Sequence, residues 1–485
     1  MVKKYHFCLL SKIIRYTSVI TSVLVFFSFS NVYAHGLNVR YELPIPLSLY
    51  LASASIIVAL TLLLLRYFRS FSPVNESRKI TENRYLGKKR SYINKIPFLI
   101  LLFLILSGLI GSQGPLDNII NVFIWVWVWV GIAYISIIFG NVWGGVSPWF
   151  NIYSLLLFYF RKNFKKYRRH SDKEAEIIGL VLLFTILWIA IIFPGREVPH
   201  NLSFFLIFYS IITLFGMAIY GRSRWNNSAE IFNLYFGMLG RLGILGRDKK
   251  NFIDNFRMPL SGVHIGKGST YSSIFIIIAV ASISFDGVLE TESWDQLRAY
   301  IVSVSFFRPI LKALVSLFGE ITLVLNTIGF ICMPLIIGFF YLLTCARAVR
   351  YGGKKINFHS MIVAFAPALI PIAAAYHVAH YFSFLLIAGQ VGIQLLSDPF
   401  GWGWNIFGTS TMQINVSIIN AKIGWVIILI SVVLGHVSSI FISHRISFKI
   451  LKNNSEALKM HLPFSILMVL YTIFSLWILA QPIVQ

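Results

Sequence analysis

The chain has 485 residues, of which 57% are hydrophobic, 16% are aromatic and only 12% are charged, and its mean hydropathy is +0.75. Because soluble globular proteins carry about 25% charged residues, this composition excludes a water-soluble enzyme, a disulfide-stapled secreted domain and a disordered chain. It is typical of an all-α integral membrane protein whose main partner is the lipid bilayer.

The formal net charge is +24, which in a soluble protein would suggest nucleic-acid binding. Here most Lys and Arg residues lie in a few segments between apolar runs, which is the distribution that orients a membrane protein. We therefore expect no nucleic-acid partner. The three cysteines show no spacing typical of a disulfide framework or a thiolate metal site.

The N-terminus is typical of a secretory signal. Residues 1–16 are basic without any acid, an apolar stretch follows over 17–29, and Val32 and Ala34 stand at the −3 and −1 positions of a cleavage site. We expect residues 1–34 to be removed, which would make His35 the first residue of the mature chain. An N-terminal histidine offers its amine and its imidazole together, a chelate that suits copper.

The rest of the chain, 35–485, is expected to form one polytopic domain of about ten transmembrane helices. The predicted spans are 44–65, 96–112, 119–140, 177–193, 201–220, 269–287, 320–344, 371–396, 421–443 and 462–480. The connecting segments alternate in charge, with 32 Lys or Arg on one side and six on the other. This bias predicts a bacterial inner-membrane protein with the mature N-terminus and the C-terminus both extracytoplasmic.

Two predicted outer segments are unusual. Apolar residues recur at near-helical spacing before the span 320–344, which predicts an interfacial helix over about 296–318. The loop 397–410 is rich in Gly and Trp, which indicates either a compact loop packed against the bundle or an aromatic anchor at the membrane interface. No phosphate-binding Gly-x-x-x-x-Gly-Lys-Ser/Thr loop is present in the sequence, so an ATP-driven pump is not expected.

Ionisable residues inside a bilayer are functional candidates, and in the predicted spans these are chiefly histidines. His380 and His436 lie at similar distances from the outer ends of adjacent, antiparallel predicted helices. Such a pair could ligate a metal, hold a haem iron, relay protons, or simply hydrogen-bond between helices. His377 lies one helical turn before His380 and is either a third ligand or a polar residue nearer the cytoplasm.

A second group of candidates is extracytoplasmic. His35, His200 and Asp398 combine imidazole and carboxylate donors, which suit copper or zinc. Asp286, at the end of the predicted span 269–287, belongs to the same outer set of carboxylates. A metal held there could also generate hydroxide from water, although acidic outer loops are more often ordinary solvated surface.

Several short motifs resemble a family of bacterial polytopic membrane proteins labelled fenitrothion hydrolase-like. The motifs are His35-Gly36, the run Arg40 to Pro46, Ala379 to Ser383, Ser397 to Pro399, Gly401, Gly403-Trp404, Phe407 to Thr409 and Gly435-His436. The resemblance implies a polytopic membrane architecture and, by the family's label, hydrolysis of an organophosphate ester. It assigns no catalytic residue.

Three function classes therefore stay open. The favoured one is a non-ATP-driven permease or assembly factor for a transition metal, with copper preferred, although Met-rich and Cys-rich tracts that would bind copper(I) are missing from the sequence. The alternatives are a membrane-embedded, metal-dependent hydrolase of a small-molecule substrate and a redox subunit in which His380 and His436 bind haem. Protein partners are not predicted.

Overall fold

The architecture is described from a computed structural model. The described residues are 95–159, 172–245, 256–263, 268–352, 357–451 and 453–480. The predicted signal 1–34, His35 and the predicted span 44–65 lie outside them. Within the described residues the chain is helical, and the only extended pairing is an isolated bridge between Leu245 and Phe256.

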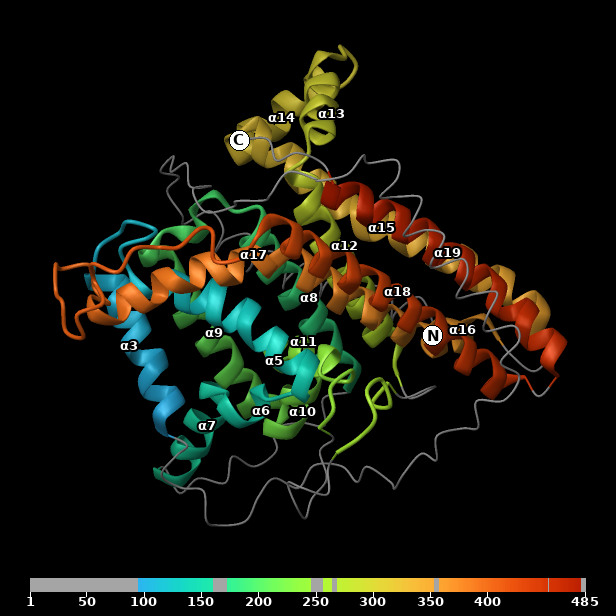
Figure 1. Cartoon of the computed structure of the whole chain (residues 1–485), viewed down its shortest axis with the longest axis horizontal. Coiled ribbons are helices and arrows are strands. Elements are labelled where there is room, and N and C mark those ends of the chain that lie inside the picture. Colours follow the sequence, from blue (N-terminus) through green and yellow to red (C-terminus); the bar gives the residue numbers. More distant parts are fainter. Residues whose placement is uncertain are drawn as a thin grey trace, which may run out of the picture.

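The helical elements of Figure 1 follow one another along the chain with short connections. They are α3 (Ile96–Ile110), α4 (Ile119–Asn121), η2 (Val122–Gly131), α5 (Ile132–Phe139), α6 (Trp143–Val146), α7 (Pro148–Tyr159), α8 (Asp172–Ile191), η3 (Pro194–Glu197), α9 (Pro199–Tyr220), α10 (Arg222–Ser228), α11 (Ile231–Leu239), α12 (Thr270–Leu289), α13 (Glu292–Ser303), α14 (Arg308–Phe318), α15 (Ile321–Gly352), α16 (Phe358–Phe365), η6 (Ala366–Leu369), α17 (Ile370–Ser397), α18 (Ala421–Ile450) and α19 (Asn454–Ala480).

Eight helical segments among the described residues are long and apolar enough to cross a membrane. They coincide with eight of the ten predicted spans, namely those at 119–140, 177–193, 201–220, 269–287, 320–344, 371–396, 421–443 and 462–480. The ninth range, 96–112, forms α3, which is apolar but only 15 residues long. The chain is thus an all-α, multi-pass membrane protein.

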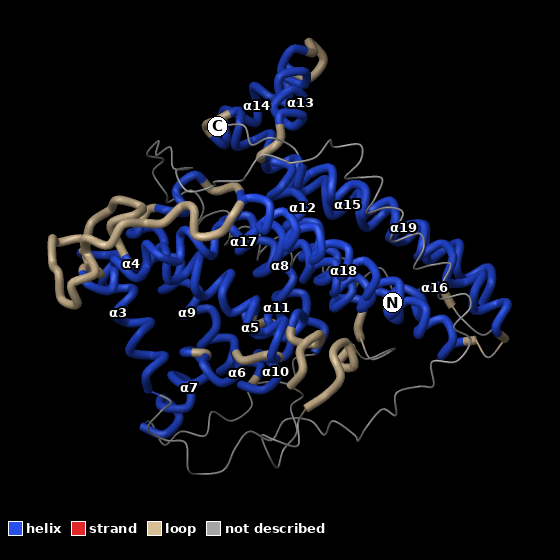
Figure 2. The backbone as a smooth tube through the Cα atoms, in the orientation of Figure 1, coloured by secondary structure: helices blue, strands red, loops and turns tan. Residues whose placement is uncertain are grey.

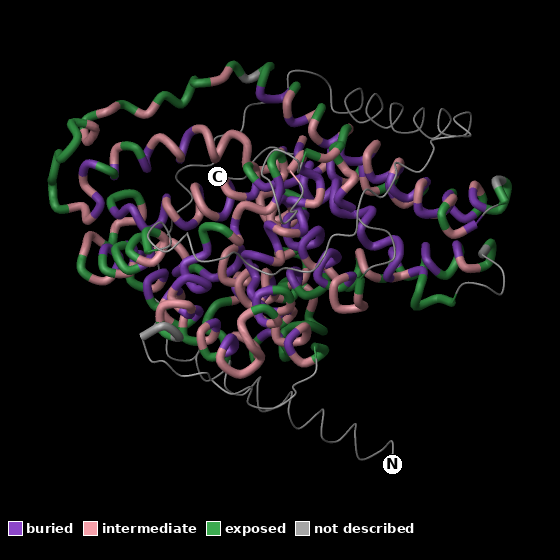
Figure 3. Tube along the Cα trace, turned by 90° about the horizontal axis from the view of Figure 1, so that it is seen from below, coloured by how far each residue is buried: buried purple, intermediate pink, exposed green. Residues whose placement is uncertain are grey.

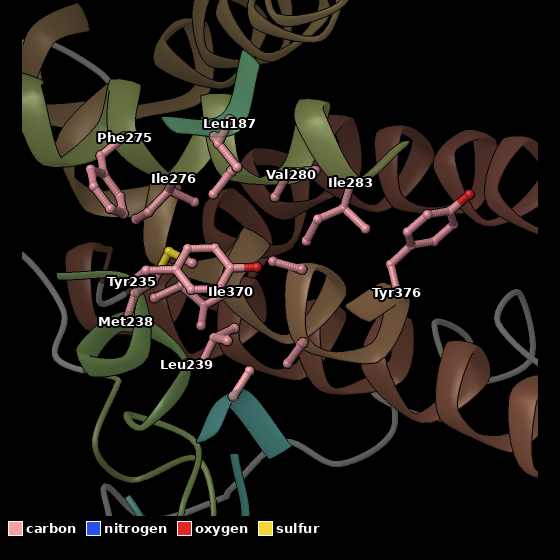
Figure 4. Packing of buried hydrophobic residues seen from close by; sticks show 14 of the residues in the cluster. Leu187, Tyr235, Met238, Leu239, Phe275, Ile276, Val280, Ile283, Ile370 and Tyr376 are labelled. Atoms are coloured by element: carbon pink, nitrogen blue, oxygen red, sulfur yellow. The ribbon is translucent and has the colours of Figure 1, made fainter. Parts of the chain in front are cut away.

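The C-terminal half forms a succession of long packed helices. In Figure 1, α17 packs on α18, α18 on α19 and α19 on α15, while α12 lies against α15 and α17. Buried residues are concentrated where these helices meet, and exposed residues lie on the periphery (Figure 3). Figure 4 shows part of this interior, where side chains such as Leu187, Tyr235, Val280 and Ile370 pack together from α8, α11, α12 and α17.

Large apolar side chains also cover the outer faces of the long helices. Phe215 on α9, Leu335 on α15 and Leu434 on α18 are all more than half exposed. In water such surfaces would associate, whereas lipid tails solvate them. The outer faces therefore agree with a bilayer environment.

Glycine allows the closest approach in the bundle. A Cβ atom at Gly435 of α18 would overlap the Cβ of Ala375 on α17 and would lie 2.8 Å from the Pro371 carbonyl oxygen. The two backbones therefore touch at this point, as small residues allow in membrane proteins. The contact fixes the register of α17 against α18.

The segment predicted as one interfacial helix over about 296–318 is instead two helices. α13 and α14 meet at an angle of 110° and stand away from the bundle in Figure 1. Val304 is extended, and Pro309 stands in the first turn of α14, a position that proline favours because its nitrogen needs no helical partner. Part of the predicted apolar face, including Leu311, packs against Val324 and Leu325 at the start of α15.

Candidate functional site

A buried carboxylate, an imidazole and a phenol meet between α12 and α17. The Oδ2 atom of Asp286 lies 3.0 Å from His380 Nε2 and 2.6 Å from the Tyr381 hydroxyl. The His380 side chain is only 4% exposed and that of Asp286 is 21% exposed. One carboxylate oxygen therefore accepts from two donors inside a membrane-spanning bundle.

The local sequence explains why these groups can meet. Asp286 lies three residues before the end of α12, and His380 and Tyr381 are consecutive residues of α17. A Cβ at Gly287 would lie 2.7 Å from the Tyr376 hydroxyl. The missing side chain at Gly287 thus lets α12 approach α17 closely enough for the Asp286 carboxylate to reach both donors.

A second layer of aromatic and imidazole side chains supports this site. His377, one turn before His380, is fully buried, and its Nδ1 lies 3.3 Å from the Tyr235 hydroxyl of α11. Tyr235 in turn stacks on Trp129 of the π-helical stretch η2, with the ring centroids 5.0 Å apart. The Tyr381 ring packs at 4.9 Å from the His377 ring. The site is held on four elements that pack rigidly together.

This arrangement can bind and release a proton. When the carboxylate is ionised, His380 Nε2–H and the Tyr381 hydroxyl both donate to it, and a second proton can enter on the imidazole or the carboxylate. A carboxylate in a bilayer is costly unless it has such partners. Retaining one inside a span is therefore most readily explained by a functional role for its charge.

His436 is not brought beside His380. The Gly435–Ala375 contact places His436 near residues at the start of α17, and Ala375 already precedes His380 by five residues, about 7 Å along the helix. The prediction of matched depth assumed that α17 and α18 begin at the same level on the outer side. A haem iron or a metal shared by both imidazoles would need them at one level, and this register separates them.

The register is shifted because the connection between the two helices folds back along α17. The Gln390 side-chain amide contacts the backbone of Asn415 at 2.9 Å and 3.1 Å, and Gln394 donates to the Met412 carbonyl oxygen. α18 consequently begins beside the middle of the outer part of α17 rather than at its end. Figure 2 shows this long loop between α17 and α18.

The first part of this loop is compact, as one of the two sequence interpretations expected. Asp398 accepts the backbone N–H groups of Trp402 and Gly403 at 2.9 Å and 2.6 Å. The Phe400 carbonyl oxygen accepts the Ser112 backbone N–H at 2.7 Å, so the loop docks on the α3–α4 connection and not over His380. The Asp398 carboxylate, predicted as a metal ligand, is occupied in holding a turn.

The other predicted ligands are also apart from one another. His200 lies exposed at the start of α9 and its ring contacts Phe204, while its backbone N–H donates to Gln113. Among the described residues no three His, Cys, Asp or Glu side chains lie close enough together to hold a metal ion. His35 lies outside the described part of the chain.

Sequence reasoning placed Asp286 among the outer carboxylates and did not connect it with His380. It also overlooked Tyr235 and His461, which is discussed below. The available signal was that Asp286 stands inside the apolar segment forming α12 rather than in a loop, and acids within spans are functional candidates. Its partner could not be deduced, because His380 is 94 residues further along the chain.

A second buried carboxylate, Glu230, caps α11 outside the spans. Its Oε1 accepts the Tyr209 hydroxyl at 2.9 Å, and its Oε2 accepts the Trp143 indole N–H at 3.1 Å and the Asn233 backbone N–H at 2.8 Å. Burial raises the pKa of Glu230 to about 7, although these hydrogen bonds oppose the shift. Since it closes the N-terminus of α11, its role is structural.

Glu230 predicts that the protein loses stability as pH rises toward neutrality. The folded state binds this proton more tightly than the unfolded state, whose pKa is near 4.5, so its contribution declines from pH 4.5 to 7 by about 3 kcal/mol. We expect the thermal unfolding midpoint in detergent to fall over this range. Glu230→Gln should be less stable but should show a flatter pH profile. An unchanged slope in Glu230→Gln would contradict the assignment.

Comparisons with known proteins do not assign the chain to a family. No family model matches the sequence, and neither a curated protein nor a solved structure shows significant similarity to it.

Proposed function

We propose that the chain is a non-ATP-driven, proton-coupled permease of the bacterial inner membrane, in which Asp286 and His380 take up and release the coupling proton. The proposal rests on one observation, the hydrogen-bonded Asp286–His380–Tyr381 cluster within the spans. Carboxylate and imidazole groups of this kind mark proton relays and ion pathways in membrane proteins.

The proposed cargo is a divalent transition-metal ion, copper(II) or zinc. Asp286 and His380 offer an oxygen and a nitrogen donor side by side, a combination that suits these ions better than soft copper(I). The same two atoms would hold either the shared proton or the metal ion, so binding of one would displace the other. With two protein donors, water would complete the coordination, which favours release over storage.

The remaining parts of the proposal concern topology. About ten spans, a cleaved signal peptide and extracytoplasmic termini follow from the apolar runs and the charge bias. The resemblance to fenitrothion hydrolase-like proteins agrees with a polytopic membrane protein. No contact among the described residues favours its hydrolytic label over transport.

The test is transport by purified protein in liposomes that contain a pH dye and a fluorescent chelator. A gradient of Zn²⁺ or Cu²⁺ should drive metal entry and an opposite change of proton concentration in wild-type vesicles. Asp286→Asn should lower both fluxes about tenfold or more, because the amide cannot exchange a proton at this position.

Asp295→Asn is the matched control, since Asp295 pairs only with Arg298 on its own helix α13, away from the cluster. It should transport like the wild type. Wild-type fluxes no faster than in protein-free vesicles would overturn the proposed function. Asp286→Asn with wild-type fluxes would overturn the role of the cluster.

A further inference from the structure

The interface between α18 and α19 is lined by polar side chains at heptad spacing. On α18 these are His436, Ser439, Ser443 and Ser447, and on α19 they are His461, Ser465, Thr472 and Ser475. All eight are buried, each at most 5% exposed. Two facing stripes of this kind form a polar seam through an otherwise apolar pair of spans.

Hydroxyl groups alone would be ordinary packing contacts between membrane helices. Ser447 and Thr472, for example, donate to carbonyl oxygens one turn earlier in their own helices, which satisfies them without any further role. The three histidines of the seam, His436, His444 and His461, are different because an imidazole has one donor and one acceptor nitrogen to satisfy.

His436 carries a buried nitrogen with no protein partner. Its Nδ1 lies 2.8 Å from the Val432 carbonyl oxygen, so Nδ1 carries the hydrogen and Nε2 is left as an acceptor. The residue is 1% exposed, and Nε2 has no hydrogen-bond partner. Its ring faces that of Tyr471 on α19, with the centroids 6.0 Å apart. A buried acceptor of this kind calls for a proton or an ordered water.

The same arrangement recurs about two turns along the seam. His461 Nε2 lies 3.2 Å from the Ile440 carbonyl oxygen and 3.1 Å from Ser443 Oγ, and its Nδ1 lies 3.2 Å from Ser465 Oγ. The His444 ring is 5.2 Å from the His461 ring, and the buried His444 Nδ1 also has no partner.

Polar groups connect these positions in steps of about one helical turn. Ser439 lies between His436 and Ser443 on α18, and all three face α19. At the other end the Tyr471 hydroxyl is hydrogen-bonded to Ser284 on α12. Ser284 precedes Asp286 by two residues, so the seam ends next to the Asp286–His380 site.

From this geometry we infer that the α18–α19 seam is a proton pathway. Protons move between His444 and His461, near the α18–α19 turn, and His436, and reach the Asp286 region through Tyr471 and Ser284. Each imidazole accepts a proton on one nitrogen and releases another from its second nitrogen, so no net charge stays in the seam. This inference rests on the proposed proton-coupled function and supplies its access route.

The experiment measures passive proton flux in proteoliposomes with trapped pH dye, driven by a potassium diffusion potential. His461→Gln and His436→Gln preserve size and hydrogen bonding but cannot exchange protons, and each should lower the flux about tenfold or more. His359→Gln is the control, because His359 lies on exposed α16 and bonds only to Thr270 across to α12. It should conduct like the wild type.

A second readout separates conduction from a structural role. His461→Ala leaves space for a small base, and added imidazole should restore flux in that variant but not in His461→Gln. If both His→Gln variants conduct normally while Asp286→Asn does not, the pathway is overturned and the permease proposal stands. If the His→Gln variants lose flux while Asp286→Asn keeps metal transport, the pathway stands and the role of Asp286 falls. Wild-type flux at the level of empty vesicles overturns both.

Discussion

Gly435→Ala should lower the free energy of unfolding by about 2 kcal/mol, and Gly435→Leu should prevent folding into a stable bundle. The added Cβ would overlap Ala375 and approach the Pro371 carbonyl oxygen at 2.8 Å. Backbone atoms of α17 cannot rotate away as a side chain can, so the two helices must separate. Thermal unfolding and size-exclusion profiles in detergent measure the effect.

Gly338→Ala is the matched control, because Gly338 also lies inside a spanning helix, α15. A Cβ there would meet only Ile277 Cγ2 at 3.8 Å, an ordinary contact. The substitution should be neutral or stabilise the protein by up to about 1 kcal/mol, since alanine is the better helix former. Equal effects at the two positions would contradict the close contact between α17 and α18.

Asp286→Ala is expected to destabilise the protein by about 2–4 kcal/mol, besides its effect on transport. The change leaves His380 Nε2 and the Tyr381 hydroxyl buried without their shared acceptor. Asp286→Asn keeps one carbonyl oxygen at this position and should cost less. Denaturant unfolding in detergent provides the comparison.

A double-mutant cycle tests whether the cluster acts as a unit. Tyr381→Phe alone removes one hydrogen bond and should cost about 1 kcal/mol. Once Asp286 is alanine, removing the Tyr381 hydroxyl should instead be neutral or favourable, since it deletes an unsatisfied buried donor. Additive losses in the double variant would show that the two side chains do not interact.

The spans were largely predictable because the bilayer imposes a local rule. A segment such as 201–220 needs about 20 apolar residues to cross the hydrocarbon layer, and α9 (Pro199–Tyr220) follows that range closely. Proline broke the rule of continuity in the predicted helix 296–318. There Val304 is extended and Pro309 begins a new helix, so an apolar pattern that looked continuous became two elements.

The candidate site was only half predictable. His380 was recognised from its position in an apolar span, and Asp286 was noticed as a nearby acid at a span end. Their pairing depends on how α12 packs against α17, with Gly287 admitting Tyr376. His436 was expected beside His380, but the loop held by Gln390 folds back along α17 and shifts the register.

The sequence by itself determined that the chain is a helical membrane protein, where most of its spans lie and which histidines stand inside them. These features depend on the cost of burying charge and backbone in lipid, which each segment meets on its own. Only the tertiary structure decided which polar groups meet, because contacts such as Asp286 with His380 and Tyr471 with Ser284 join helices far apart in the chain. Those contacts depend on helix register and on small residues at the crossings, and neither is encoded in the hydrophobicity of a single span.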